Sequence, residues 1–246
     1  MSADYQRNRV RDSGGALVYP SGNEKEDRHP MLLRLEGPSE LPHAGGKPNS
    51  LVVLLHGLGA DGNDLIGLAP YWAPALPQTE FLAPHAPFPC DMAPQGRQWF
   101  SLQDRSPAMI LAGVRAAATI LDDFLDEALR ARDLDASRLA LVGFSQGTMM
   151  ALHVGLRRAP ALAGIVGFSG SLRGAETLAD ELRSKPPILL VHGDADPVVP
   201  FQALAAAQTA LQQLDVPVET LARPGLGHSI DETGLQRAGE FLRRVL

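Results

Sequence analysis

The residues with the clearest chemical potential in this 246-residue chain lie in the run Gly143-Phe144-Ser145-Gln146-Gly147. This G-x-S-x-G pattern directly follows an apolar, strand-like run and directly precedes a run with helical periodicity. A sharp turn from strand to helix projects its central serine hydroxyl, and the two glycines leave room for the turn. The N-terminus of the following helix directs free N–H groups and a positive dipole end toward a developing oxyanion. The pattern therefore predicts Ser145 as the nucleophile of an acyl-transfer reaction.

A serine hydroxyl needs a general base, and in hydrolases with this turn the chain order is Ser, then Asp or Glu, then His. Three histidines follow Ser145: His153, His192 and His228. His153 falls on the helix that Ser145 precedes, more than two turns away, where packing is its simplest role. His192 ends an apolar run and is suited to shaping the turn that follows. His228 lies in a glycine-flanked loop before the last expected helix, so we predict His228 as the base.

Two aspartates compete to orient that base, Asp194 and Asp196, both directly after the apolar run 188–191. Asp194 is close to the strand end and is suited to accept backbone N–H groups within the turn. Asp196 lies further along the loop, and Pro197 fixes the backbone that leaves it. We favour Asp196 as the partner of His228, where it would hold the imidazole tautomer and stabilise the imidazolium. Asp194 is the alternative.

A second oxyanion donor is expected from the run His56-Gly57-Leu58-Gly59-Ala60-Asp61-Gly62, which follows the apolar run 51–55. In folds of this kind the loop after that strand donates a backbone N–H. His56-Gly57 alone is more typical of a plain turn, and only its combination with the serine turn favours the functional interpretation. The backbone N–H groups of Leu58 and Gln146 are the predicted pair.

These residues need a scaffold that brings strand ends together, and the rest of the pattern supplies one. Short apolar runs alternate with stretches of helical period, which is typical of a mostly parallel sheet covered by helices on both faces. The sequence therefore predicts one α/β domain over 31–246, preceded by a polar extension over 1–30 that we expect to be flexible. An edge strand is expected at 31–35. The other expected strands are 51–55, 80–83, 138–142, 164–168, 188–191 and 216–221, and the expected helices are 107–130, 147–158, 176–183, 202–214 and 233–245.

Composition narrows the class of protein further. The net charge is −6 and no basic run is present, so we expect no nucleic-acid partner. No apolar stretch is long enough to span a bilayer, and no apolar segment of a secretory signal precedes residue 30, so a cytoplasmic location is expected. Cys90 is the single cysteine, and the histidines are dispersed, so no metal site is expected. Phe88-Pro89-Cys90-Asp91 offers no strand-to-helix turn, and Cys90 is interpreted as an unreactive surface or loop thiol.

Taken together, the motifs around His56, Trp99-Phe100, Ser145, Asp196 and His228 resemble the phospholipase/carboxylesterase family of α/β-hydrolases, which includes the acyl-protein thioesterases. The resemblance covers about residues 48–246. It implies an α/β-hydrolase fold and hydrolysis of carboxylic esters or thioesters without metal or organic cofactor, using Ser145, Asp196 and His228, with Leu58 and Gln146 as oxyanion donors. It also implies that Trp99 and Phe100 border the acyl pocket; core packing is the alternative role for this pair. Thr148 departs from the glycine that many members carry.

The expected substrate follows from what can cover the site. The segment 172–185 reads as one helix with its connections, which leaves no room for a large cap domain. The Pro-rich segment 83–106 would flank an open, apolar cleft suited to short or medium acyl chains. The expected partners are a small-molecule ester or thioester, or an acylated protein, and a homodimer is consistent with the sequence. The alternative function is a catalytically silent α/β-hydrolase fold that binds a ligand or partner.

Overall fold

The computed structural model describes residues 34–246. The expected flexible extension over 1–30 lies outside the described residues, as do the first three positions of the expected edge strand at 31–35. Its last two positions, Arg34 and Leu35, are in a loop, and the edge strand is instead β1 (Ser39–Glu40). Leu35 is buried without pairing in the sheet, so its apolar side chain reflects core packing rather than a strand.

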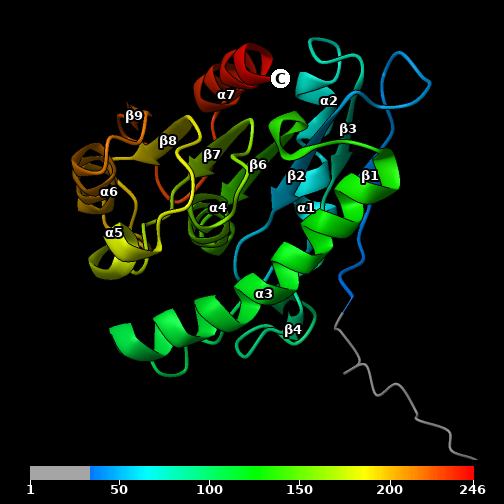
Figure 1. The fold of residues 1–246 in the computed structure, drawn as a ribbon. Coiled ribbons are helices and arrows are strands. Elements are labelled where there is room, and N and C mark those ends of the chain that lie inside the picture. Colours follow the sequence, from blue (N-terminus) through cyan, green and yellow to red (C-terminus); the bar gives the residue numbers. More distant parts are fainter. Residues whose placement is uncertain (1–33) are drawn as a thin grey trace, which may run out of the picture. The chain divides into compact units, whose positions relative to one another are not determined.

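The core of the molecule is a seven-stranded sheet with the order β1-β3-β2-β6-β7-β8-β9 (Figure 1). Every neighbouring pair is parallel except β1 with β3, which is antiparallel. Strand β6, which leads into Ser145, lies at the centre, between β2 and β7. The parallel strands are β2 (Ser50–Leu55), β3 (Thr79–Leu82), β6 (Leu139–Phe144), β7 (Gly164–Phe168), β8 (Ile188–Gly193) and β9 (Val218–Arg223).

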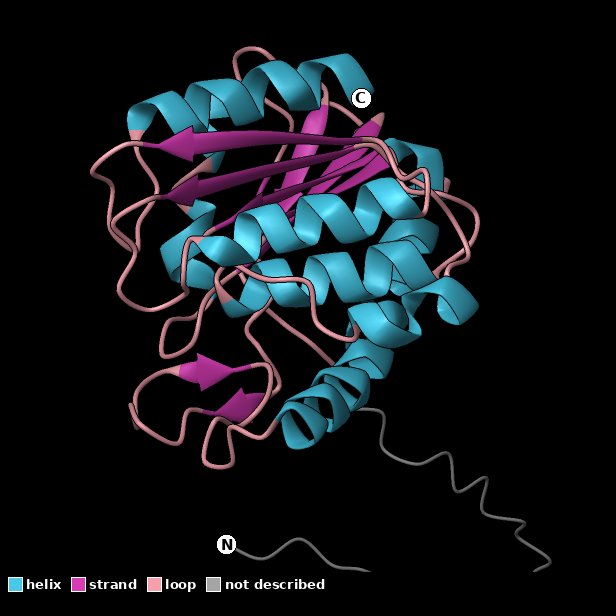
Figure 2. Ribbon diagram, turned by 90° about the vertical axis from the view of Figure 1, so that its left-hand side faces the viewer, coloured by secondary structure: helices cyan, strands magenta, loops and turns pink. Residues whose placement is uncertain are grey.

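Helices cover both faces of this sheet, and the alternation along β2 shows why. Leu51, Val53 and Leu55 point into one apolar core, whereas Val52 and Leu54 point into another. The first core is closed by α3 (Pro107–Arg132), α4 (Gln146–Arg157) and α6 (Gln202–Gln213), and the second by α1 (Gly62–Ile66), α2 (Ala69–Trp72) and α7 (Glu232–Val245) (Figure 2). The predicted mostly parallel sheet with helices on both faces is confirmed.

The long helix α3 agrees with its expected start. Ser106 is the N-cap residue and Pro107 occupies the first turn, although the Ser106 side chain makes no capping hydrogen bond. The helix ends two residues later than expected, where Asp133 adopts the left-handed conformation (φ 59°) that terminates helices. The expected helix over 176–183 is shorter and irregular: a 3-10 turn, η2 (Ala175–Thr177), leads into α5 (Leu178–Glu181).

A two-stranded hairpin of β4 (Phe88–Pro89) and β5 (Arg97–Gln98) lies apart from the main sheet (Figure 2). It belongs to the Pro-rich segment that was expected to flank the site. Cys90 follows β4 and is buried rather than at the surface. A further 3-10 turn, η1 (Ala136–Arg138), leads into β6.

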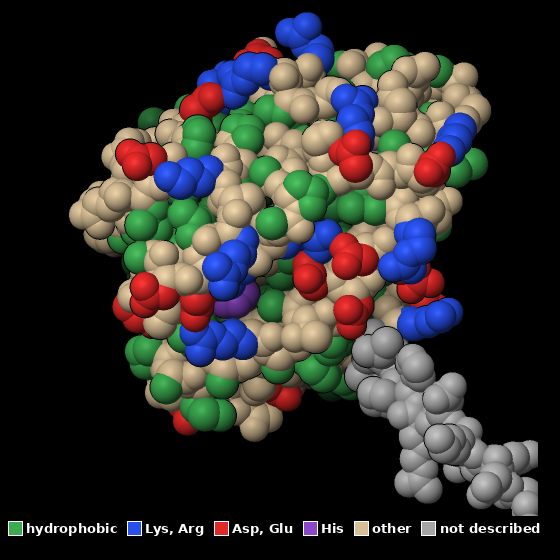
Figure 3. Space-filling view, in the orientation of Figure 1, with side chains coloured by type: hydrophobic (Ala, Val, Ile, Leu, Met, Phe, Trp, Pro, Cys, Tyr) green, Lys and Arg blue, Asp and Glu red, His purple; other side chains and the backbone are tan. Residues whose placement is uncertain are grey.

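Nothing large is inserted between β7 and β8, where η2 and α5 are the regular elements, as expected for a fold without a sizeable cap. On the face shown in Figure 3, Lys and Arg side chains are interspersed with Asp and Glu side chains. Within residues 34–246 no helix combines the length and apolar character that crossing a membrane would require.

Candidate active site

Ser145 occupies the turn between β6 and α4, with backbone angles φ 54° and ψ −114°. A non-glycine residue rarely adopts a positive φ, so this turn is strained and must be held by its surroundings. A Cβ at Gly143 would overlap the backbone of Gly147, and a Cβ at Gly147 would overlap the Leu55 carbonyl. The Ser145 N–H donates to the Phe168 carbonyl of β7 (2.9 Å), which anchors the turn to the neighbouring strand.

His228 and Asp196 meet at the same edge of the sheet although they come from different loops. Asp196 follows β8 and His228 lies between β9 and α7, and the His228 Nδ1 is 2.7 Å from the Asp196 Oδ2. The other carboxylate oxygen accepts the backbone N–H groups of Val198 (2.8 Å) and Val199 (2.9 Å). The Asp196 side chain is fully buried. Burial acts to raise its pKa, but the hydrogen bonds from His228 and these two amides outweigh burial, so the pKa of Asp196 lies below its ordinary value.

The competing residues have other partners. The Oδ1 of Asp194 accepts the Gly225 N–H (2.7 Å), a backbone contact of the kind expected for it. The His192 Nε2 lies 3.0 Å from the Val199 carbonyl and 3.3 Å from the Asp196 Oδ2, so this histidine supports the aspartate loop. His153 is buried on α4 beside α3, and burial lowers its pKa to about 4.

A cleft of about 480 Å³ brings the predicted residues together. Ser145, His228, Leu58 and Gln146 all line it, and the Phe144 ring packs against the His228 imidazole with centroids 4.9 Å apart. Charged side chains in the lining are few, namely Asp64, Arg105 and Arg173. The apolar side chains that line it are those of Leu58, Ala60, Met92, Phe100, Leu102, Ile110, Phe144, Met149, Val198 and Val199.

The loop that carries Leu58 is fixed from within by His56, a contact that the sequence motif did not reveal. The buried His56 Nε2 accepts the Ala86 N–H (2.9 Å), so the proton must be on Nδ1, which donates to the Gly57 carbonyl (2.7 Å). That carbonyl belongs to the same peptide unit as the Leu58 N–H. Burial lowers the pKa of His56 despite the bond to Gly57, which keeps the ring neutral and this tautomer in place.

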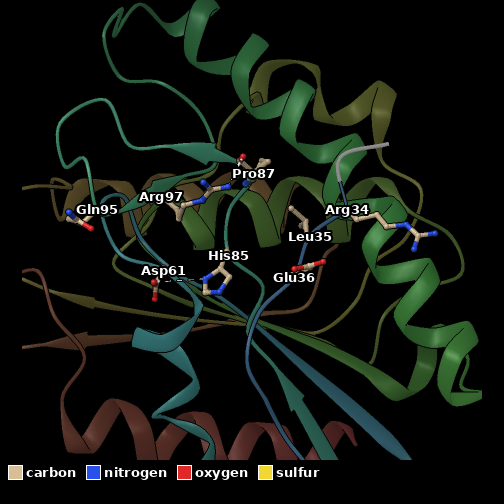
Figure 4. A pocket seen from close by; sticks show the side chains of 8 residues that line it. All are labelled: Arg34, Leu35, Glu36, Asp61, His85, Pro87, Gln95 and Arg97. Atoms are coloured by element: carbon tan, nitrogen blue, oxygen red, sulfur yellow. Dashed lines mark hydrogen bonds and ion pairs between the residues drawn. The ribbon is translucent and has the colours of Figure 1, made fainter. Parts of the chain in front are cut away.

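The outer side of the same loop is held by the hairpin. The Gly59 N–H donates to the Arg97 carbonyl (2.9 Å), and the Arg97 N–H donates to the Ala60 carbonyl (2.8 Å). Figure 4 shows Arg97 beside His85 and Asp61 in a pocket of about 340 Å³ behind the loop. There Arg97 donates to the carbonyls at residues 86 and 87, and the His85 Nδ1 accepts the Gly62 N–H (3.1 Å). The residues that line this pocket therefore support the loop, and Ser145 is not among them.

Trp99 and Phe100 separate in the structure. Phe100 lines the cleft, as the family resemblance implied, whereas Trp99 does not and is fully buried behind it. The Trp99 indole donates to the His56 carbonyl (3.0 Å), and its backbone N–H donates to the Gln146 Oε1 (3.1 Å). The Gln146 Nε2 in turn donates to the Phe100 carbonyl (2.9 Å). Core packing was the alternative for this pair, and it describes Trp99.

Thr148, the departure from the family pattern, lies under the serine turn. It is buried, and its Oγ1 is 2.8 Å from both the Gly143 and the Phe168 carbonyls, to either of which its single proton can be donated. These carbonyls belong to β6 and β7, so the hydroxyl links the two strands at the turn. Within the described part of the chain, no group of three or more His, Cys, Asp or Glu side chains could hold a metal ion.

The arrangement offers a hydroxyl, an imidazole oriented by a buried carboxylate, and backbone N–H groups at a helix start and in a braced loop, all at one apolar cleft. Such a set can transfer an acyl group from an ester or thioester to serine and then to water. The amide of Gln146 lies at the first turn of α4, where N–H groups have no intrahelical partner.

Comparison with known proteins supports the same chemistry. The profile of the Phospholipase/Carboxylesterase family matches residues 39–246. Acyl-protein thioesterase 1 of Neurospora crassa is 29% identical over 226 residues, covering 85% of this chain and 92% of that protein. Esterase YpfH of Escherichia coli is 30% identical over 197 residues, covering 80% and 83%. Among solved structures, esterase PE8 superposes with a TM-score of 0.83 at 42% identity, covering 87% of this chain and 100% of that one.

Proposed function

This chain belongs to the phospholipase/carboxylesterase family and is a serine ester hydrolase, and we propose that Ser145, His228 and Asp196 form its catalytic triad. The substrates that we propose are carboxylic esters and thioesters with short to medium acyl chains. One observation carries the assignment: the histidine that is bonded to a buried carboxylate by Nδ1, at 2.7 Å, lines the same cleft as the strained serine. Its Nε2 is thereby left as the nitrogen that can accept a proton.

In the acylation step, the Ser145 Oγ attacks the acyl carbonyl carbon while the His228 Nε2 takes the hydroxyl proton. The buried Asp196 stabilises the imidazolium without itself being protonated. Charge develops on the carbonyl oxygen, and the Leu58 and Gln146 N–H groups donate to it. The intermediate then collapses, the bond to the leaving group breaks, and His228 gives its proton to the departing alcohol or thiol.

In the deacylation step, His228 takes a proton from water, and the resulting hydroxide attacks the acyl-enzyme carbonyl. The same two N–H groups stabilise the second oxyanion, and His228 returns the proton to the Ser145 Oγ as the carboxylic acid leaves. Every proton in this cycle moves through one imidazole, so the residues that fix its orientation matter as much as the nucleophile.

The proposed preference for short to medium acyl chains rests on the size of the cleft. Its volume of about 480 Å³ is in the lower part of the roughly 300–1,000 Å³ range of small-molecule pockets. Phe100 and Ile110 are buried at the cleft, and large side chains of this kind limit the depth available to the acyl chain. No sizeable insertion after β7 covers the site, which supports access from solvent without a moving cap.

Acylated proteins are the second substrate class that we propose, beside small esters. The cleft rim carries two exposed apolar side chains, Met92 (61% exposed) and Val198 (62% exposed), which can contact a substrate beyond its acyl group. The relative from Neurospora crassa is named an acyl-protein thioesterase, which supports this class. A thiol is also a better leaving group than an alcohol, so the proposed machinery suits both bonds.

The location and assembly that we propose are a cytoplasmic protein and a homodimer. Cys90 is the single cysteine, so the chain cannot form an internal disulfide, which suits a reducing compartment. The exposed apolar side chains Tyr71 and Leu41 are candidates for a contact between copies. Light scattering at micromolar concentration should give twice the chain mass of 26.3 kDa, and the monomer mass at every concentration would contradict the dimer.

The triad is tested by covalent labelling with a fluorophosphonate probe. The wild type should label once per chain, Ser145→Ala should not label, and the matched surface variant Ser137→Ala should label like the wild type. A folded wild-type protein that does not label would support the ligand-binding alternative instead.

The substrate range is tested with 4-nitrophenyl esters and acyl thioesters of graded chain length, with Ser145→Ala as the blank. We expect kcat/KM to be highest for acyl chains of roughly four to eight carbons, a range suited to a pocket of this size. A steady rise through long chains, together with activation at a lipid interface, would contradict the proposed preference.

A further inference from the structure

A short segment after β7 passes beside the serine turn and carries Arg173 into the catalytic cleft. The segment, residues 169–173, begins where the Phe168 carbonyl accepts the Ser145 N–H. A Cβ placed at Gly170 would lie 3.0 Å from the Ser145 carbonyl oxygen, so this backbone is in close contact with the turn. Arg173 at its end is one of the residues that line the cleft.

Arg173 is a half-buried arginine with no acidic partner among residues 34–246. Arg97 and Arg138 also lack one, but their guanidinium groups donate to backbone carbonyls. Other half-buried arginines form ion pairs. Arg132 pairs with Glu80, Arg157 with Glu181, and Arg158 with Asp122 and Asp126. The Nε of Arg173 is buried and has no hydrogen-bond partner among residues 34–246. Burial lowers the pKa of this guanidinium, and no neighbouring carboxylate offsets that effect. A partly buried cation without a counter-ion favours a bound group that supplies the missing charge.

The same segment holds two further polar atoms without partners, the Oγ atoms of Ser169 and Ser171. Both are buried, and both hydroxyls can donate a hydrogen bond. Residues 169–173 therefore hold three unused donors and one positive charge without a counter-ion next to the serine turn, and of these residues only Arg173 lines the cleft. The two other charged lining residues, Asp64 and Arg105, are exposed and keep their contact with water.

We infer that Arg173 binds an anionic group of the substrate, so that the preferred substrates are esters or thioesters carrying a carboxylate or phosphate besides the bond that is cleaved. This inference rests on the proposed function. A planar guanidinium forms two parallel hydrogen bonds to either oxyanion. Arg173 is then a specificity-determining residue, because it acts on the non-reacting end of the substrate.

The experiment compares matched pairs of substrates that differ in one anionic group. On the acyl side the pair is 4-nitrophenyl hydrogen adipate and 4-nitrophenyl hexanoate. On the leaving-group side the pairs are butyryl glycerol phosphate with glycerol monobutyrate, and the butyrate esters of 3-hydroxyphenylacetate and its amide. The measured quantity is the ratio of kcat/KM for the anionic member to that for the neutral member.

We expect this ratio to exceed one in the wild type for at least one pair and to fall about 10-fold or more in Arg173→Met, as the loss of a charge-assisted hydrogen bond predicts. Arg173→Lys keeps the charge but cannot form the two parallel hydrogen bonds of a guanidinium, so its ratio should lie between those of the wild type and Arg173→Met. Arg130→Met, which removes an exposed arginine of α3, should keep the wild-type ratio. The pair that responds identifies the end of the substrate and the anion.

A ratio that is the same in wild type, Arg173→Met and Arg173→Lys for every pair would overturn the inference. Should Arg173→Met not fold, competition in the wild type decides: adipamate or glycerol phosphate should inhibit hexanoate ester hydrolysis at least 10-fold more strongly than its neutral counterpart, adipamide or glycerol, and equal inhibition within both pairs would overturn the inference. Fluorophosphonate labelling and hydrolysis of the neutral esters report on the proposed function separately, so failure of one is distinguishable from failure of the other.

Discussion

His56 and Leu58 are coupled through a single peptide unit. The His56 Nδ1–H donates to the Gly57 carbonyl (2.7 Å), and this carbonyl belongs to the same peptide unit as the Leu58 N–H. A trans peptide is planar, so fixing its carbonyl fixes the direction of its N–H. His56 is therefore a positioning residue for the proposed oxyanion donor. It lies behind the cleft and outside its lining.

Replacing His56 should impair turnover more than substrate binding. His56→Leu removes both ring contacts, and we expect kcat for a neutral ester to fall about 10- to 100-fold with a smaller change in KM, since a misplaced oxyanion donor costs up to about 10²–10³-fold. His56→Asn, which can restore a donor near Nδ1, should recover part of the loss. A change confined to KM, or equal losses in both variants that follow the loss of folded protein, would contradict a positioning role.

The two aspartates after β8 should behave differently on amidation. Asp196→Asn would favour the wrong tautomer of His228, and kcat should fall by about 10⁴-fold, the loss measured for the equivalent change in a serine protease. Asp194→Asn keeps an oxygen for the Gly225 N–H and should lose less than about 3-fold. Steady-state kinetics with one neutral ester measures both. A larger loss in Asp194→Asn than in Asp196→Asn would reverse the assignment.

His153 should make the protein less stable as the pH falls from 7 to 5. Burial lowers its folded-state pKa to about 4, whereas the unfolded value is near 6.5, so between these values the unfolded chain binds the additional proton. The free energy of unfolding should therefore drop by about 2 kcal/mol on this account between pH 7 and pH 5. Urea unfolding of wild type and His153→Gln at both pH values isolates the contribution. An equal pH-dependence in the two proteins would contradict it.

The serine turn should not tolerate a methyl group on its glycines. In Gly147→Ala the new Cβ would overlap the Leu55 carbonyl of β2, and backbone cannot move aside cheaply, so we expect a loss of more than about 4 kcal/mol or an insoluble protein. Gly67→Ala is the matched control, because its φ of −59° suits alanine and its new Cβ would meet only ordinary contacts. Thermal unfolding measures both. A stable, active Gly147→Ala protein would show that the turn is less constrained than described.

The sequence predicted the parts of this fold that depend on local signals. The apolar runs that became β2, β6 and β8 each lead directly into one of the predicted motifs, so both these strands and the loops after them could be predicted. The G-x-S-x-G run predicted its own turn because only glycines fit there. A Cβ at Gly143 would meet the backbone of Gly147, and a Cβ at Gly147 would meet the Leu55 carbonyl of the adjacent strand β2. The chain order of serine, acid and histidine then limited the choice of partners.

What the sequence did not predict depends on contacts between distant segments. The hairpin of β4 and β5 has strands of two residues each, too short for any periodicity to be recognised. Trp99 and Phe100 are adjacent in the chain, yet one is buried behind the cleft and the other lines it. Their backbone is held by Gln146, which accepts the Trp99 N–H and donates to the Phe100 carbonyl. Arg173 belongs to no motif, and only the lack of a partner in the folded protein distinguishes it from an ordinary loop arginine.

The two hydrogen bonds of the Gln146 side chain affect how the substrate selectivity of this enzyme can be changed, by engineering or in evolution. The Gln146 amide side chain joins the wall of the cleft at Phe100 to the residue that follows Ser145, the proposed nucleophile. Replacing the Phe100 ring by a smaller side chain would widen the cleft and leave both Gln146 hydrogen bonds intact, because they are made to backbone. Acyl-chain selectivity would then change with little loss of kcat. Inserting or deleting residues between 91 and 98 would instead displace Trp99 and Phe100 from Gln146. The kcat and the acyl-chain selectivity would then change together.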